Sequence, residues 1–346
     1  MVYFNSDYMV GAHPEVLARL IETNAAHTVG YGDDEYTARA RELILRRCEI
    51  PSGNVFFMVG GTQTNAVVID RLTDRNDGVI AAETAHIAVH EAGAIELTGH
   101  KVLTLPDPEG KLRADAIDRY MSTFYSDETN PHMVRPAIVY LSFPTELGLL
   151  YSKQELEDIY NVCRRWNMLL YIDGARMAYG LASPANDLEL SDIARLCDAF
   201  YIGGTKCGAL FGEAVVTRRP ELFNRFISLM KMHGALLAKG RLLGVQFETL
   251  FESDLYERIG RHAVDMALKL REIFTARGYR AVYDSPTNQQ FFQLPNDVVE
   301  RLKAGASFEL WGAPGPSAST VRFVTDWATT SATLDTLATL LQPLSH

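Results

Sequence analysis

Short apolar runs alternate with stretches of helical periodicity over the first two thirds of the chain. The apolar runs predict buried strands at 54–59, 78–82, 102–105, 135–142, 168–172, 200–202 and 212–217. Between them, apolar residues at helical spacing predict helices that begin near Pro14, Tyr36, Thr62, Arg113 and Ser152. A regular alternation of strand and helix is typical of an α/β fold with a mostly parallel sheet.

The pattern changes in the last third of the chain. Residues 220–277 have an almost entirely helical pattern, in which we expect breaks near Gly234 and Gly260. Short strands at 279–282, 291–294 and 320–324 follow, together with helices near Val298 and at 332–341. We therefore predict a large domain over residues 1–239 and a smaller C-terminal α+β domain over residues 240–346.

Composition narrows the class of protein. The 33 Lys and Arg residues against 43 Asp and Glu give a net charge of -10, which argues against nucleic-acid or anionic-membrane partners. The chain opens without the pattern of a signal peptide, and no apolar run is long enough to span a bilayer. Its four cysteines form no CxxC motif, which argues against a zinc cluster or disulfide scaffold and favours a reducing cytoplasm.

Glycines follow the first predicted strand directly. Gly60-Gly61-Thr62 separates the strand at 54–59 from the next helix. The free backbone N–H groups of a helix N-terminus bind anions, and glycine lets a phosphate approach the backbone closely. This segment therefore predicts a phosphate cup. The alternative is a simple helix cap by Thr62.

A lysine follows a buried strand in the segment Phe200-Tyr-Ile-Gly-Gly-Thr-Lys206. A lysine that is buried or flanked by cations loses its proton more easily and can attack a carbonyl. Lys206 is therefore a candidate nucleophile, although the segment alone is equally compatible with an ordinary loop lysine.

Two further groups stand at strand ends. Asp173 leaves the strand at 168–172, where open α/β sheets bind their ligands; the alternative is a structural pair with Arg176, three residues later. His86 and His90 are four residues apart, on one helical face. The segment lacks the Glu that follows the first His in zinc proteases, and no third ligand is evident, so we expect no metal. One histidine is expected to face a site and the other to cap or pack.

Together these groups fit the chemistry of pyridoxal 5'-phosphate (PLP). The phosphate needs a helix N-terminus, and the aldehyde needs a lysine. The pyridine nitrogen needs a carboxylate that keeps it protonated, and the flat ring needs a flat partner such as imidazole. A cofactor-free lysine aldolase would need neither the phosphate cup nor Asp173.

Several motifs in this order resemble one known family over nearly the whole chain. They are Ser6-Asp7, Tyr31-Gly32-Asp33, Gly61-Thr62-Gln63-Thr64-Asn65, Ala85-His86, Thr145-Glu146-Leu147-Gly148, Asp173-Gly174-Ala175-Arg176, Gly203-Gly204-Thr205-Lys206 and Val321-Arg322-Phe323-Val324. The family is that of the threonine aldolases and aromatic amino acid β-eliminating lyases, which are fold-type I PLP enzymes. The resemblance implies a large domain with a mostly parallel seven-stranded sheet and a smaller C-terminal domain.

The resemblance also implies roles for individual residues. Lys206 matches the lysine that bonds to the aldehyde of PLP, Asp173 the partner of the pyridine nitrogen, and His86 the imidazole stacked on the ring. The phosphate cup matches Gly60, Gly61 and Thr62, with a possible hydroxyl from Thr205. The groups around the substrate carboxylate match Ser6, Arg176 and Arg322. Tyr31 and Lys239 are expected to reach the site of a neighbouring subunit, because family members form homodimers or homotetramers.

Glu146 departs from the pattern of many threonine aldolases, which carry a histidine there. The Thr-Glu-x-Gly form resembles the phenylserine-aldolase-like branch, and a buried Glu146 could take the proton of a substrate hydroxyl. The expected activity is cleavage of L-β-hydroxy-α-amino acids, of the threonine or phenylserine type, to glycine and an aldehyde. The alternative is β-elimination, which releases a keto acid and ammonia. A PLP-binding protein without catalytic output is disfavoured, since the chain has no DNA-binding module or basic patch.

Overall fold

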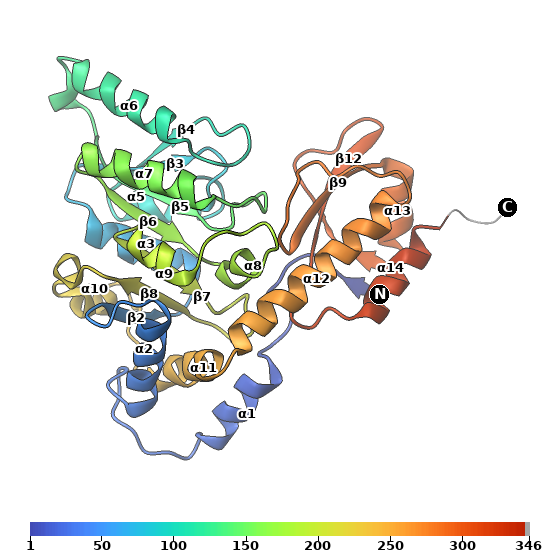
Figure 1. Ribbon diagram of the computed structural model, residues 1–346, viewed down its shortest axis with the longest axis horizontal. Helices are drawn as coiled ribbons and strands as arrows, with labels where there is room; N and C mark the ends of the chain where they lie inside the picture. The colour runs from blue at the N-terminus through green and yellow to red at the C-terminus, as the bar shows by residue number, and fades with distance from the viewer. Residues whose placement is uncertain (343–346) are drawn as a thin grey trace.

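A seven-stranded sheet forms the centre of the molecule in the computed structural model, which describes residues 1–342 (Figure 1). The strand order is β2-β8-β7-β6-β5-β3-β4. The bounds are β2 (Asn54–Met58), β3 (Asp77–Ala82), β4 (Lys101–Leu105), β5 (Arg135–Ser142), β6 (Leu169–Asp173), β7 (Ala199–Gly203) and β8 (Glu213–Thr217). Six strands run in one direction and β8 runs in the opposite direction, so the prediction of a mostly parallel seven-stranded sheet is confirmed.

Helices flank this sheet (Figure 1). The longer ones are α1 (Pro14–Glu22), α2 (Glu35–Arg47), α3 (Gly61–Leu72), α6 (Ala114–Ser126), α7 (Lys153–Arg165) and α11 (Arg241–Glu252). Every residue of β3, β7 and β8 is buried, as expected for strands covered on both faces. The expected capping box begins α7, where Ser152 and Glu155 bond reciprocally to each other's backbone.

Short helices fill the connections between strands. They are α4 (His86–Val89), α5 (Ala94–Leu97), α8 (Met177–Leu181), α9 (Leu190–Arg195) and α10 (Phe226–Met232). None of them spans more than seven residues, so periodicity is a weak signal for them. For this reason neither α8 nor α9 is among the predicted helices.

A second, smaller core packs around an antiparallel sheet of order β11-β12-β9. Its strands are β9 (Gln289–Pro295), β11 (Glu309–Leu310) and β12 (Ala318–Val324), and its helices are α13 (Asn296–Lys303) and α14 (Ser331–Leu340). The N-terminal strand β1 (Val2–Tyr3) pairs here with β10 (Ala306–Ser307), and Phe4 is fully buried in this core. The expected strand at 279–282 is wrong, because only Ala281 forms an isolated bridge, to Phe292.

The helix α12 (Leu255–Thr275) links the two cores (Figure 1). Along α12, the buried side chains of the larger apolar cluster extend as far as Val264, and those of the smaller one begin at Met266. The domain boundary at residue 239 stays a prediction. No helix among residues 1–342, α12 included, is long and apolar enough to cross a membrane.

The predicted helix break near Gly260 is wrong, since Gly260 lies within α12. The chain breaks earlier, between Glu252 and Leu255, and as expected it also turns at Gly234, with φ of 67°. A Cβ atom at Gly260 would lie 2.3 Å from the carbonyl oxygen of Ala178. Glycine is therefore required at this position because α12 approaches α8 too closely for a side chain.

We expect Gly260→Ala to destabilise the protein by about 1–3 kcal/mol through overpacking. In an unconstrained helix interior the same change stabilises by about 1 kcal/mol, so the sign of the effect is diagnostic. Gly11→Ala is the control, because a Cβ there would meet no atom closer than Leu210 Cδ2, at 3.8 Å. Chemical denaturation of both variants measures the difference, and a stabilised Gly260→Ala protein would contradict the close packing.

Candidate cofactor and active site

The predicted chemical groups meet at one edge of the large sheet. His86 follows β3, Glu146 follows β5, Asp173 ends β6 and Lys206 follows β7. These four strands are parallel, so their carboxyl ends lie at the same edge. A cavity of about 300 Å³ opens there, and all four residues line it.

The backbones of β6 and β7 approach each other closely at this edge. A Cβ atom at Gly174 would lie 2.0 Å from the carbonyl oxygen of Tyr201, and one at Gly203 would lie 2.3 Å from that of Ala175. The backbone that approaches Gly174 therefore belongs to the neighbouring strand. This contact holds Asp173 and the Lys206 loop side by side.

The N-terminus of α3 opens into the same cavity. Gly60 is the N-cap residue, no side chain caps the helix, and its first turn carries no acidic residue. The simple cap by Thr62 is thus not formed. A Cβ atom at Gly60 would have no neighbour within 4 Å, so space remains beside the free N–H groups. This end of α3 can hold an anion.

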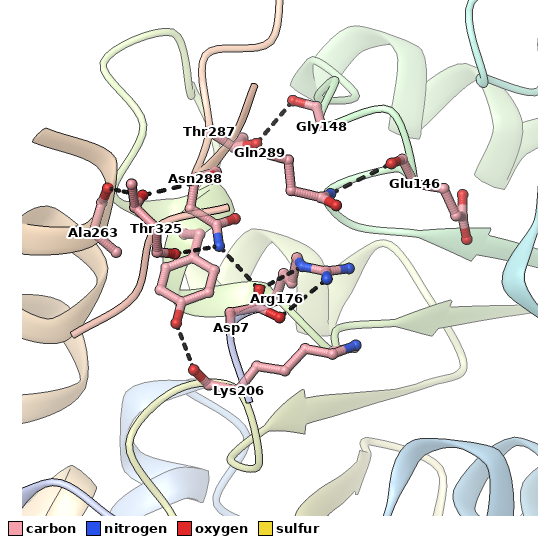
Figure 2. A network of polar contacts seen from close by, with 12 residues as sticks. Asp7, Glu146, Gly148, Arg176, Lys206, Ala263, Thr287, Asn288, Gln289 and Thr325 are labelled. Carbon is pink, nitrogen blue, oxygen red and sulfur yellow. Dashed lines mark hydrogen bonds and ion pairs between the residues drawn. The ribbon is translucent and has the colours of Figure 1, made fainter. Parts of the chain in front are cut away.

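Lys206 extends into the cavity beside Arg176 (Figure 2). Burial lowers the pKa of the Lys206 amine, and the positive charge of Arg176 lowers it further, against the opposing effects of Asp7, Asp173 and Glu213. A lowered pKa increases the fraction of neutral amine, which is the nucleophilic form. The backbone of Lys206 is held by the hydroxyl of Tyr179, which donates to its carbonyl oxygen.

Asp173 is buried and surrounded by hydrogen-bond donors. Its Oδ2 accepts hydrogen bonds from Tyr140 Oη at 2.6 Å and Asn65 Nδ2 at 2.9 Å, and its Oδ1 accepts one from the backbone N–H of Ala175 at 3.0 Å. Burial raises the pKa of Asp173, but hydrogen bonds from Tyr140, Tyr201 and Asn65 outweigh burial and leave the pKa below its ordinary value. The carboxylate is therefore held as an anion.

His86 is fixed from behind by a second carboxylate. Its Nδ1 lies 2.7 Å from Glu91 Oε1, which also accepts a hydrogen bond from Asn65 Nδ2 at 2.8 Å. This contact fixes the orientation of the imidazole ring. The His86 side chain is 38% exposed while that of Glu91 is fully buried, so the ring is anchored on one side and open on the other. The second histidine, His90, packs with its ring centre 5.7 Å from that of His86.

Glu146 lies beside His86 in the cavity wall. Its Oε1 accepts hydrogen bonds from Ser142 Oγ at 2.6 Å and from the backbone N–H of His86 at 2.8 Å. Burial raises the pKa of Glu146 above its ordinary value, despite the opposing hydrogen bond from Ser142. A carboxylate with a raised pKa is a stronger base.

A buried ion pair holds Arg176 in place (Figure 2). Arg176 Nε and Nη2 donate to the two carboxylate oxygens of Asp7, at 2.6 and 3.1 Å, and Asn288 donates to Asp7 Oδ2 at 2.9 Å. Arg176 therefore pairs with Asp7 rather than with Asp173. Arg176 is also among the residues that line the cavity.

Arg322 lies on β12, near Arg176 and Asp7, but it does not line the cavity. Its guanidinium lies 4.9 Å from the ring centre of Trp311, forms an ion pair with Glu309 and donates to Gln289 Oε1 at 3.1 Å. Burial lowers the pKa of Arg322, and the charge of Arg176 lowers it further. A bound anion near Arg322 would offset the effects of burial and of the Arg176 charge.

Thr205 and Glu213 form a contact on the cavity wall. The Thr205 hydroxyl lies 2.8 Å from Glu213 Oε1 and accepts a hydrogen bond from the backbone N–H of Gly212 at 3.0 Å. Both residues line the cavity together with Gly60, Gly61 and Thr62.

Besides Arg322, three predicted residues lie outside the lining of this cavity. Ser6 is buried beside a separate cavity of about 210 Å³, and its hydroxyl has no hydrogen-bond partner among residues 1–342. Tyr31 is largely exposed, with the Lys231 amine 4.7 Å from its ring centre. Lys239 is close to it, since the backbone N–H of Tyr31 donates to the carbonyl oxygen of Ala238 at 3.0 Å. The roles given to these three residues stay predictions.

Five polar residues of this site have no role predicted from the sequence: Asp7, Asn65, Glu91, Tyr140 and Glu213. Asp7 and Asn65 stand inside the quoted motifs, and Glu91 stands five residues after His86. The usable signal for Glu213 is a carboxylate at the start of a wholly buried strand. No feature of the local sequence distinguishes Tyr140 from the apolar residues of the same strand.

The cavity fits PLP. Space beside an uncapped helix N-terminus suits the phosphate, and the anionic Asp173 suits a protonated pyridine nitrogen. The cavity also holds an amine of lowered pKa, Lys206, and an anchored imidazole with an open side, His86. These groups are the ones that the cofactor needs, and they share one cavity.

The fold and this set of residues define a PLP-dependent enzyme of fold type I. The sequence model of the β-eliminating lyase family matches residues 4–294. The chain is 33% identical to a low specificity L-threonine aldolase of Pseudomonas aeruginosa, over 94% of this chain and 93% of that protein. The chain therefore belongs to the β-eliminating lyase family, and it is a PLP-dependent lyase.

Solved structures agree with this assignment. A threonine aldolase of Leishmania major superposes with a TM-score of 0.94 and 41% identity, over 98% of both chains. An aspartate aminotransferase of Thermus thermophilus superposes with a TM-score of 0.72 and 17% identity, over 98% of this chain and 90% of that one. The second comparison shows a shared fold only.

We expect Tyr140→Phe to weaken PLP binding roughly tenfold or more, as for loss of a hydrogen bond to a charged group. The change removes a donor that keeps the pKa of Asp173 low, so more of this buried carboxyl group is protonated, and a neutral acid cannot pair with a protonated pyridine nitrogen. Tyr171→Phe is the matched control, because its hydroxyl donates to the neutral Asn65 Oδ1 at 3.0 Å. Equilibrium titration with PLP measures both, and equal losses would contradict the charge-specific role.

Proposed function

We propose that the protein cleaves L-β-hydroxy-α-amino acids to glycine and an aldehyde, with PLP as cofactor. The observation that carries this proposal is the cavity that joins Lys206, Asp173 and His86 to a free base, Glu146. The similarity to threonine aldolases of Pseudomonas aeruginosa and Leishmania major supports the same reaction.

The arginines and the lysine bind and orient the substrate. Arg176 and Arg322 would hold its carboxylate, and Ser6 would add a hydroxyl that has no other partner among the described residues. Lys206 would supply the amine that bonds to the aldehyde of the cofactor. When bound, PLP supplies an electron-accepting ring that stabilises negative charge at the substrate α-carbon. Asp173 would keep the pyridine nitrogen protonated, and His86 would pack against the ring.

Glu146 would remove the proton from the β-hydroxyl group. Loss of this proton lets the electrons of the O–H bond form the carbonyl of the aldehyde while the bond between the α- and β-carbons breaks. A proton then returns to the α-carbon, and glycine is released. Ser142 and the backbone of His86 hold Glu146 Oε1 and leave its other oxygen free of protein hydrogen bonds among residues 1–342.

We also propose that the protein works as a homodimer or homotetramer in which Tyr31 and Lys239 complete a neighbouring site. Exposed apolar side chains support an interface between copies: Tyr8, Met9, Val10, Leu17, Ile21, Val29, Ile227 and Met232. All four cysteines are buried as free thiols, which supports the predicted reducing compartment, the cytoplasm.

A product assay tests the reaction. The purified protein with PLP is expected to release glycine and the matching aldehyde from threonine or phenylserine, and Lys206→Ala is expected to abolish this turnover. Pyruvate or another keto acid with ammonia would instead assign β-elimination. Full turnover by Lys206→Ala would contradict the catalytic role of the lysine.

The pH profile tests Glu146. Only the ionised carboxylate is a base, so kcat/KM is expected to rise with pH through the raised pKa of Glu146. Glu146→Gln is expected to remove this limb and to slow cleavage by roughly 10²- to 10⁴-fold. Unchanged cleavage kinetics in that variant would remove Glu146 from the proton transfer.

Ser142→Ala provides the matched control for this experiment. The Ser142 hydroxyl lowers the pKa of Glu146, so its loss is expected to move the acidic limb to higher pH. The rate at alkaline pH is expected to change little, because the base itself remains. If the acidic limb of the pH profile does not move in this variant, the limb reports the titration of a group other than Glu146.

A further inference from the structure

A buried carboxylate stands beside the phosphate cup. Glu213 is the first residue of β8 and pairs with Met58 of β2 on one side and with Gly203 of β7 on the other. From Met58 the chain continues directly into Gly60 and the N-terminus of α3. Glu213 is 4% exposed and lines the same cavity as that N-terminus. A negative charge here would face the negative charge of a phosphate.

Glu213 has hydrogen-bond partners but no ion pair. Its Oε2 accepts a hydrogen bond from the backbone N–H of Gly204 at 3.1 Å, and its Oε1 lies 2.8 Å from Thr205 Oγ. No basic nitrogen among residues 1–342 lies within 4 Å of its carboxylate oxygens. A buried carboxyl group without an ion pair tends to take up a proton instead of remaining charged.

Other ionisable groups face Glu213 from the surrounding elements. Burial raises the pKa of Glu213 and the charge of Asp173 raises it further, while Thr205, Lys206 and the Gly204 N–H oppose the increase. The remaining neighbours are hydroxyl and thiol groups whose own pKa values burial raises: Tyr171, Tyr201, Cys207 and Tyr256. Lys206 is thus the one cation among the named neighbours, and it reacts with the cofactor.

The single hydroxyl hydrogen of Thr205 can be donated either to Glu213 or to the phosphate. A hydroxyl group has one hydrogen and two acceptor positions. The N–H of Gly212 occupies one acceptor position of Thr205 Oγ. An ionised Glu213 can only accept, so it takes the single hydrogen of Thr205 and leaves none for a phosphate. A protonated Glu213 donates its own hydrogen to the second acceptor position and frees that of Thr205.

We propose that Glu213 holds a proton whenever the phosphate of PLP is bound, and that it acts through Thr205. The carboxylic acid of Glu213 donates to Thr205 Oγ, and the Thr205 hydroxyl donates to a phosphate oxygen. Phosphate binding at a pH where the free Glu213 is ionised then takes up one proton from solution. The proposal rests on PLP as the cofactor and not on which reaction follows.

The test uses pyridoxine 5'-phosphate, which has the phosphate but no aldehyde and so cannot bond to Lys206. Its binding to the cofactor-free protein is measured by calorimetry from about pH 6 to pH 9, in buffers of different ionisation enthalpy, which reports the protons taken up. Above the pKa of Glu213, the natural protein is expected to take up roughly one more proton per bound molecule than Glu213→Gln. Any change in the charge of the phosphate itself is common to both proteins.

Glu213→Gln reproduces the proposed hydrogen-bond pattern without a titrating group. Its amide oxygen can accept from Gly204 while its amide N–H donates to Thr205. Its affinity is expected to match that of the natural protein at low pH. As pH rises through the pKa of Glu213, the affinity of the natural protein for pyridoxine 5'-phosphate is expected to fall up to about tenfold per pH unit. The affinity of the variant is expected not to show this fall.

Thr205 variants test the second hydrogen bond. Thr205→Val is expected to weaken binding of pyridoxine 5'-phosphate roughly ten- to a hundredfold, as for a hydrogen bond to a charged group. Thr205→Ser is expected to restore it. Binding of pyridoxine, which lacks the phosphate, is expected to be unaffected by all three substitutions.

Each other outcome overturns the proposal. Tighter binding by Glu213→Gln at every pH would mean that Glu213 stays ionised and repels the phosphate. Weaker binding at every pH would mean that an anion is required, and an equal pH dependence would mean that Glu213 does not titrate with binding.

A second measurement is independent of folding of the variants. Infrared difference spectra of the natural protein with and without pyridoxine 5'-phosphate are expected to show the carbonyl stretch of a new carboxylic acid at alkaline pH, and its absence counts against the proposal. Neither experiment involves turnover, so both remain valid if the product assay rejects the aldolase reaction.

Discussion

The buried ion pair between Asp7 and Arg176 joins three parts of the chain that are far apart in sequence. Asp7 comes from the N-terminal segment, Arg176 from the end of the large sheet, and Asn288, which supports Asp7, from the smaller core (Figure 2). Removing one partner of such a pair leaves an uncompensated buried charge, which costs about 3–5 kcal/mol. The same pair aims Arg176 into the cavity, so the packing of the two cores and the geometry of the substrate site depend on one contact.

Three carboxyl groups of the cavity differ in the balance between burial and hydrogen-bond donors. Asp173 has several hydrogen-bond donors and stays ionised, whereas burial dominates at Glu146 and Glu213 and raises their pKa. Asn65 donates a hydrogen bond to Asp173 and another to Glu91 through one amide nitrogen. Three carboxyl groups can thereby serve as a permanent anion, a base and a proton carrier at one sheet edge.

Much of the fold could be predicted from local pattern, because buried strands are continuous apolar runs and glycines mark the turns that follow them. The start of a helix at Ser152 and the turn at Gly234 were also predicted correctly from local residues. The break expected at Gly260 failed because glycine has two uses. It can end a helix, or it can let a neighbouring backbone approach, and only the position of α8 distinguishes these uses.

The order of the chemical groups, namely a phosphate cup, a histidine, an acid and a lysine, is readable in the amino-acid sequence, because local turn chemistry places each group after its strand. The partners of these groups follow from the packing of distant segments. Arg176 pairs with a carboxylate 169 residues earlier, and Glu213 reaches the phosphate cup because β8 inserts beside β2. Such contacts depend on strand order and register, which bring distant residues into a dry interior where each charge needs a donor. No local pattern of residues encodes that arrangement.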